Sequence, residues 1–111
     1  MRLLKDNQGL VRLKAQHTVE LPMLYGNNNV RINVIKGKIQ LNHGSYTPDG
    51  GTWLMNPNGG RTAHYPMIEG QTYDLVLDIR KSFGKQDRIT IVNTSLFRQA
   101  EFTFIVRNDL N

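Results

Sequence analysis

Apolar and polar residues alternate along most of the chain, and the alternation is most regular between Tyr73 and Arg107. Apolar side chains occupy every second position in three runs there, at 73–79, 89–91 and 102–106. A period of two places one face of a strand on a core and the other face in water. The sequence therefore predicts three consecutive β-strands in this region, and it shows no convincing helical period elsewhere.

The first forty residues predict further strands separated by turn signals. We expect a strand over 11–15, and its continuation to Pro22 stays open. The cluster Asn27–Asn29 is polar and turn-prone, because Asn side chains hydrogen-bond their own backbone. The remaining signals are a strand over 30–34, a break in the alternation at Ile35, a tight turn or bulge at 36–38, and apolar positions at Ile39 and Leu41.

The composition changes between Asn42 and Pro66, where Gly, Pro and Asn recur. Asp49-Gly50 and Asn58-Gly59 supply the positive φ angles that hairpin turns require. The stretch between them, Thr52–Pro57, is long enough for one short strand. We interpret residues 42–66 as a long loop or hairpin arm, and loops of this length in compact domains tend to be functional or flexible.

Together these elements predict seven or eight closely spaced strands in a single all-β domain over residues 1–111. Many short strands joined by turns are typical of an antiparallel β-sandwich of the jelly-roll or immunoglobulin-like (Ig-like) type. A five-stranded barrel of the oligonucleotide-binding type (OB-like) is the alternative. Residues 1–9 are interpreted as an N-terminal arm that packs elsewhere.

Charge and cysteine content narrow the possible partners and chemistry. Fourteen Lys and Arg against nine Asp and Glu give a formal charge of +5, which favours anionic partners or simply solubility. Cysteine is absent, which excludes disulfides, thiolate chemistry and sulfur-ligated metals. Residues 1–6 lack the apolar core of a signal peptide, and no apolar run approaches the roughly 20 residues that span a bilayer. We expect a soluble chain made in the cytosol, with no membrane contact.

Catalytic signatures are weak. None of the plausible serine nucleophiles lies in a Gly-x-Ser-x-Gly elbow, and the three histidines have no partner at metal-ligand spacing. We therefore predict that the protein is not an enzyme and has neither a metal site nor a cofactor.

The long loop carries the better binding candidates. Planar aromatic rings beside polar groups suit a sugar, and aromatics with Arg are also enriched where proteins bind each other. The alternative is that Trp53 anchors the loop to its own domain. The candidate residues for a protein partner or a glycan are Tyr46, Trp53, Arg61, His64 and Tyr65.

The most basic segment is the connection between the first two of the three regular strands. A nucleic-acid base could stack on its aromatic residue while the surrounding cations hold phosphates, as in single-strand binders. Basic residues near exposed strand ends also serve to block unwanted strand pairing. The residues concerned are Arg80, Lys81, Phe83, Lys85 and Arg88.

In length, strand content and absence of cysteine, the chain resembles the small β-sandwich accessory subunits of phage particles. This is a resemblance of type without a shared motif. It implies a structural subunit of a larger protein assembly, such as a virion decoration or tail-associated protein, that forms a homo-oligomer. A glycan-binding module and a single-stranded nucleic-acid binder are the alternatives from other classes.

Overall fold

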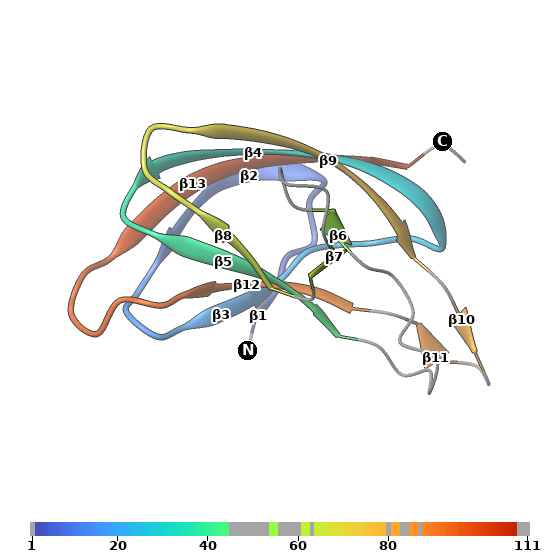
Figure 1. The fold of residues 1–111 in the computed structure, drawn as a ribbon, viewed down its shortest axis with the longest axis horizontal. Coiled ribbons are helices and arrows are strands. Elements are labelled where there is room, and N and C mark those ends of the chain that lie inside the picture. The colour runs from blue at the N-terminus through green and yellow to red at the C-terminus, as the bar shows by residue number, and fades with distance from the viewer. Residues whose placement is uncertain are drawn as a thin grey trace.

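Two β-sheets, of five and four strands, pack on each other and form an all-β, sandwich-like structure (Figure 1). The structure is a computed structural model. It describes residues 2–44, 54–55, 61–62, 64–79, 81–82, 85–86 and 88–108. Across these ranges every regular element is a strand. The all-β class and the packing of two sheets confirm the broad prediction from the sequence.

The five-stranded sheet has the order β1-β3-β12-β5-β8. Its neighbours are antiparallel except for the parallel pair β1 and β3. The strands are β1 (Arg2–Leu3), β3 (Thr18–Glu20), β12 (Arg88–Asn93), β5 (Ile39–Gly44) and β8 (His64–Met67).

The four-stranded sheet has the order β2-β13-β4-β9 and is antiparallel throughout. Its strands are β2 (Gln8–Leu13), β13 (Ala100–Asn108), β4 (Gly26–Lys36) and β9 (Thr72–Ile79). Two small antiparallel pairs accompany the sheets. They are β6 (Leu54–Met55) with β7 (Arg61–Thr62), and β10 (Lys81–Ser82) with β11 (Lys85–Gln86).

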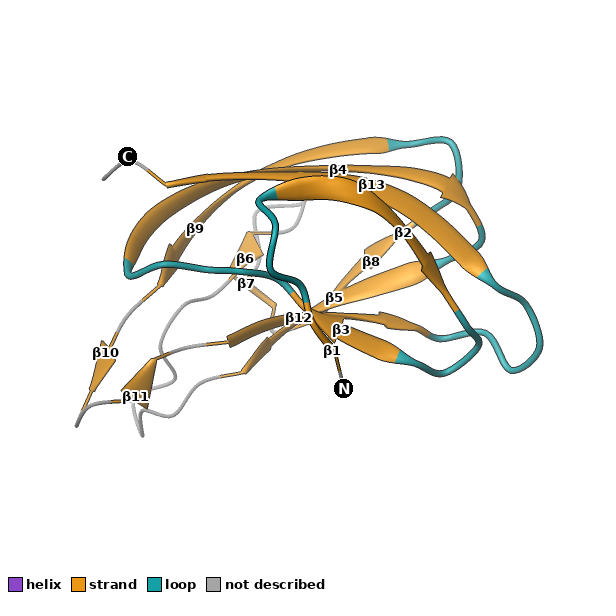
Figure 2. Cartoon of the chain, turned by 180° about the vertical axis from the view of Figure 1, so that it is seen from behind, coloured by secondary structure: helices purple, strands orange, loops and turns teal. Residues whose placement is uncertain are grey.

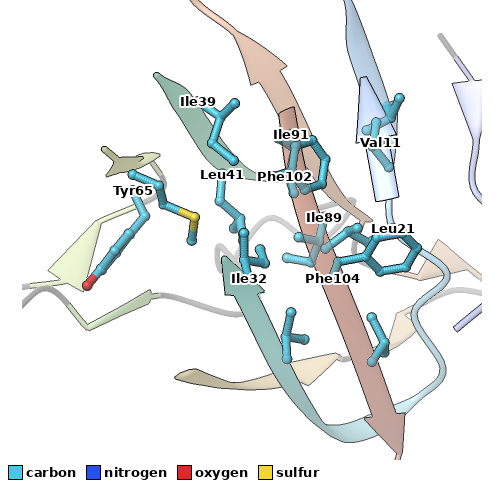
Figure 3. Packing of buried hydrophobic residues seen from close by; sticks show 14 of the residues in the cluster. Val11, Leu21, Ile32, Ile39, Leu41, Tyr65, Ile89, Ile91, Phe102 and Phe104 are labelled. Carbon is cyan, nitrogen blue, oxygen red and sulfur yellow. The ribbon is translucent and has the colours of Figure 1, made fainter. Parts of the chain in front are cut away.

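The core lies between the two sheets and is built from the inward positions of their alternating strands (Figure 3). In β13 the inward residues Ala100, Phe102, Phe104 and Val106 are all buried, while the residues between them are partly or fully exposed. Phe102 and Phe104 contact each other with ring centroids 6.5 Å apart. Period-two alternation therefore explains both the strand and its place in the core.

The three regular runs at 73–79, 89–91 and 102–106 are confirmed as β9, β12 and β13. The break at Ile35 is also confirmed. Lys36 pairs with Glu101 while Val34 pairs with Phe102, so Ile35 is the extra residue of a β-bulge. Its side chain is exposed, as expected for a position that leaves the alternation.

A single strand continuing from residue 11 to Pro22 is not what the structure shows. β2 and β3 belong to different sheets, and a turn at 14–17 separates them. Gln16 has a φ of 62°, in the left-handed region, which ends the extended conformation there. Apolar alternation on both sides of the turn hid this break.

The turn predicted at Asn27–Asn29 is also wrong, because these residues lie within β4. Asn28 is completely buried, and its Nδ2 donates to the carbonyl oxygens of Leu24 (2.9 Å) and Gly26 (3.0 Å). The chain turns just before the strand instead, and Gly26 has a φ of 96°. Asn28 therefore lies in the strand, and its buried side chain stabilises the preceding turn through hydrogen bonds to the backbone.

The segment predicted as an N-terminal arm is incorporated in the chain's own sheets. Arg2 and Leu3 pair with β3, and the Leu4 N–H donates to the carbonyl oxygen of Glu20 (2.9 Å). The connection that follows crosses to the other sheet, where β2 begins at Gln8 (Figure 2). The N-terminal residues therefore complete one edge of each sheet.

Candidate functional site

The sandwich has two ends, which carry different connections (Figure 1). We call the first the turn end, and it gathers the short connections 14–17, 37–38, 68–71 and 94–99. The other end carries β10 and β11 and the connection between β3 and β4. Hydrogen bonds tie the turn end together, because Gly37 N–H donates to Glu69 Oε1 (2.8 Å) and Gly70 N–H donates to the Val34 carbonyl (2.8 Å).

The residues predicted from the long loop fall into three groups. Tyr46 and Trp53 lie outside the described residues, and Arg61 is placed only as a backbone position of β7. Tyr65 is buried in the core (Figure 3). Its ring packs edge-on against Tyr73 with centroids 5.9 Å apart. Tyr65 therefore contributes to the core, which removes one aromatic ring from the exposed surface.

His64 lies on the outer face of the five-stranded sheet, beside amide side chains of the neighbouring strand. His64 Nδ1 lies 2.8 Å from Asn42 Oδ1 and 3.3 Å from Gln40 Nε2. Gln40 Nε2 also donates to Asn42 Oδ1 (2.6 Å). This imidazole–amide chain orients polar groups on the sheet surface.

The basic segment is described only in part. Arg80 and Phe83 lie outside the described residues, while Lys81 and Lys85 are placed as backbone positions of β10 and β11. Arg88 is on β12, where its Nε donates to Glu20 Oε1 at 2.7 Å. A carboxylate partner neutralises part of the positive charge that the sequence assigned to this segment.

The long loop and the basic segment, the two sites predicted from the sequence, start from neighbouring strands. Their positions in the sequence do not indicate this. Arg88, where the basic segment enters β12, pairs directly with Gly44, where the long loop leaves β5. His64 pairs with Asn42 on the other side of β5. The described parts of both sites therefore meet at the same end of the five-stranded sheet.

Within the described ranges, no group of three or more His, Cys, Asp or Glu side chains is arranged to hold a metal ion. In the same part of the chain, no helix is long and apolar enough to cross a membrane.

An ion pair crosses the outer face of the four-stranded sheet. Arg31 on β4 donates from Nε to Asp74 Oδ1 on β9 at 2.7 Å, across a direct strand pair. This hydrogen bond, together with the attraction between the charges, raises the pKa of Arg31 above its ordinary value. Both side chains are exposed and line a shallow hollow of about 270 Å³. The pair orders the polar surface around this hollow.

Two adjacent, highly exposed apolar residues form the tip of the connection between β12 and β13. Phe97 is 91% exposed and Leu96 is 66% exposed. Ser95 shapes the tip, because its Oγ accepts the N–H groups of Phe97 (3.3 Å) and Arg98 (3.0 Å). We call Leu96 and Phe97 the apolar tip.

Asn93 fixes the base of this connection. Its side chain is completely buried, and Nδ2 donates to the carbonyl oxygens of Leu13 (2.9 Å) and Arg98 (2.7 Å). Its Oδ1 accepts the Ser95 N–H (3.0 Å). A buried amide with three partners holds the connection in one geometry, so the apolar tip is presented by a supported turn.

The apolar tip was not predicted from the sequence. A signal was present, because two adjacent large apolar residues stand within an otherwise polar connection. Such a pair does not follow the period-two alternation of a strand that faces the core.

Comparisons with known proteins concern the fold. The sequence matches no protein-family model and no curated protein at a significant level. The structure is similar to a solved structure described as "Crystal structure of PirA", with a TM-score of 0.58 and 13% sequence identity. The similarity covers 94% of this chain and 96% of that one. At this identity the likeness indicates a shared fold over nearly the whole chain.

Proposed function

We propose that the protein is a non-catalytic structural subunit that assembles with copies of itself through the apolar tip. The observation that carries this proposal is the exposure of Leu96 and Phe97 on a turn fixed by Asn93 and Ser95. A virion decoration or tail-associated subunit is the specific form of this role that the sequence predicts.

Exposure and rigidity together support an interface at the tip. Scattered apolar side chains are normal on protein surfaces, but two adjacent ones on a supported turn form a compact anchor. Burying a Phe side chain contributes about 2 kcal/mol. The turn is already ordered by its own hydrogen bonds, so little conformational entropy is lost when a partner covers it.

We also infer that the sandwich is a jelly roll. Leaving out the short β1, β6, β7, β10 and β11, eight strands remain, and they pair from the outside inwards. The first pairs with the last (β2 with β13), the second with the seventh (β3 with β12), the third with the sixth (β4 with β9) and the fourth with the fifth (β5 with β8). Such nested pairing corresponds to one long hairpin rolled into two sheets.

The two alternative functions stay predictions. A glycan module using Trp53 and a nucleic-acid binder using Phe83 both depend on residues outside the described ranges. The carboxylate of Glu20 beside Arg88 weakens the case for phosphate binding at that position.

Size-exclusion chromatography with light scattering tests the proposal. We expect the wild-type chain to form an oligomer whose population rises with concentration. Phe97→Ser should shift it towards the monomer, because losing about 2 kcal/mol per tip weakens each contact roughly 30-fold.

Val76→Ser is the matched control. Val76 is 68% exposed on β9, on the outer face of the four-stranded sheet, away from the turn end. The control should leave the oligomer intact. A wild-type chain that stays monomeric at every concentration, or a control that dissociates the oligomer as strongly as Phe97→Ser, would contradict the proposal.

A further inference from the structure

A groove of about 660 Å³ runs along one side of the sandwich, where the edges of the two sheets face each other. β2 forms the edge of the four-stranded sheet, and β1 with β3 forms the edge of the five-stranded sheet on the same side. The groove is lined by Arg2, Arg12, Leu13, Lys14, Gln16, His17, Thr18 and Val19.

The groove is strongly basic. Exposed nitrogen-bearing side chains come from Arg2, Arg12, Lys14 and His17, and none of the described residues that line the groove is acidic. Arg12 meets the carboxylate of Glu101 in a single long contact of 3.4 Å. Leu13 and Val19, which also line the groove, are buried. Clustered cations of one sign attract a polyanion and concentrate it at the surface.

The backbone that carries these side chains is held firmly. The Gln16 N–H donates to the Asn93 carbonyl (2.8 Å), and the Asn93 N–H donates to the His17 carbonyl (3.0 Å). Gln16 is the non-glycine residue with a positive φ in the described ranges, at 62°. A left-handed conformation in a residue other than Gly, Asn or Asp is costly, and such strain is often found at functional sites. Here it turns the chain so that Lys14 and His17 line the same groove.

The lining chemistry distinguishes between classes of polyanion. Single-stranded nucleic acids are bound by stacking their bases on aromatic side chains as well as by holding phosphates. None of the described residues that line this groove is Phe, Tyr or Trp, and the small imidazole of His17 is the one ring among them, so a run of stacked bases has no extended platform there. A sulfated polysaccharide needs no stacking, because it displays anionic groups along its length. We propose that the groove binds a sulfated polysaccharide through Arg2, Arg12, Lys14 and His17.

This site is separate in its chemistry from the apolar tip and does not depend on the proposed assembly. The two share only the support of Asn93. A simpler role for these charges is to prevent unwanted pairing of the β2 edge with another chain, since Lys and Arg commonly protect edge strands. Edge protection requires no ligand, so direct binding measurements separate the two roles.

Binding of labelled heparin to the full chain tests the proposal, with unsulfated dextran and oligothymidylate as comparison ligands. We expect the wild type to bind heparin, with an affinity that falls steeply between about 50 and 200 mM salt. The variant Arg2→Gln/Lys14→Gln should bind at least about tenfold more weakly. Its slope of log affinity against log salt should fall by about two, because each lost contact removes about one unit.

The matched control is Lys38→Gln/Arg107→Gln, which removes two positive charges outside the groove. It should keep nearly all of the heparin affinity, and circular dichroism should show both variants folded. Absence of heparin binding by the wild type, or equal losses in the two variants, would overturn the proposal. It would also be overturned if oligothymidylate bound as tightly as heparin and with the same dependence on Arg2 and Lys14, because the site would then recognise nucleic acid.

Discussion

Single buried asparagines organise the two ends of the sandwich. Asn93 joins the connection 94–99 to the end of β2 through the Leu13 carbonyl. At the other end, Asn28 supports the turn before β4, and Asn108 Nδ2 donates to Asn28 Oδ1 (3.1 Å). A buried amide with all its hydrogen bonds made stabilises one local geometry. A buried polar group that loses its hydrogen-bond partner costs desolvation free energy.

Asn93→Ala should lower the free energy of unfolding by about 3 kcal/mol, because two carbonyl oxygens and one N–H lose their partner. Urea denaturation followed by circular dichroism measures this change. Ser95→Ala is the control within the same connection, and it should lower stability by less than about 1 kcal/mol because its hydrogen bonds are exposed. Equal effects of the two substitutions would argue against Asn93 as the main support.

These asparagines also show where residue-level reasoning from the sequence fails. Asn is typical of turns, and in the sequence Asn27–Asn29 looks like one. The structure places Asn28 in a strand, with its side chain bonded to the turn that precedes it. Whether an Asn forms a turn or supports a neighbouring one depends on tertiary burial, which local sequence does not record.

At the scale of elements, strands were predictable and breaks between them were not. β9, β12 and β13 follow directly from period-two alternation. The turn at 14–17 interrupts a similar pattern without Gly, Pro or Asn, and the left-handed residue is Gln16. Gln is unfavourable in the left-handed conformation, so the local sequence does not predict this turn. Backbone hydrogen bonds between the turn and Asn93 hold the chain in that conformation instead.

Substitutions at two glycine turns can separate the effect of steric crowding on stability from the effect of backbone strain. Gly37 and Gly70 have φ angles of 81° and 83°, which L-residues rarely adopt. A Cβ at Gly37 would lie 3.2 Å from the Ala100 Cβ and 3.3 Å from the Gln99 carbonyl oxygen, whereas a Cβ at Gly70 would meet nothing within 4 Å.

Gly37→Ala should therefore destabilise the protein more than Gly70→Ala. Gly70→Ala should cost about 1 kcal/mol from the left-handed conformation alone. Gly37→Ala should cost at least about 1 kcal/mol more, because Ala100 is buried and its backbone has little room to move. Thermal unfolding of both variants measures the difference, and equal melting temperatures would show that the turn at Gly37 relaxes freely.

At the scale of the whole molecule, the pairing of distant strands creates sites that the sequence does not display. Arg2 and Lys14 line one groove only because β1 and β2 form the edges of different sheets on the same side. In the sequence these basic residues look scattered, and the densest basic segment, 80–88, is the one that the sequence predicts as a site. The order of the strands in the sheets decides which charged residues lie close together. Alternation within single strands does not specify that order.

The same pairing pattern should govern folding. Within the two large sheets, every pair except β5 with β8 joins strands that are separated by at least one other strand of those sheets, and β2 with β13 is the pair most distant in sequence. Closing the loop between β2 and β13 costs about 1 kcal/mol more than closing the loop between β5 and β8, since each doubling of length adds about 0.6 kcal/mol. We therefore expect β5 and β8 to pair before β2 and β13, and refolding to take milliseconds to seconds.

Stopped-flow kinetics of two core variants tests this order. Leu41 on β5 and Val11 on β2 are both buried. Leu41→Ala should mainly slow folding, because its contacts form in the transition state, whereas Val11→Ala should mainly accelerate unfolding. Both should destabilise the protein by more than about 0.6 kcal/mol, which makes the ratio of kinetic to equilibrium change reliable. If Val11→Ala slowed folding and left unfolding unchanged, the β2–β13 pair would form early, and loop length would not set the folding order.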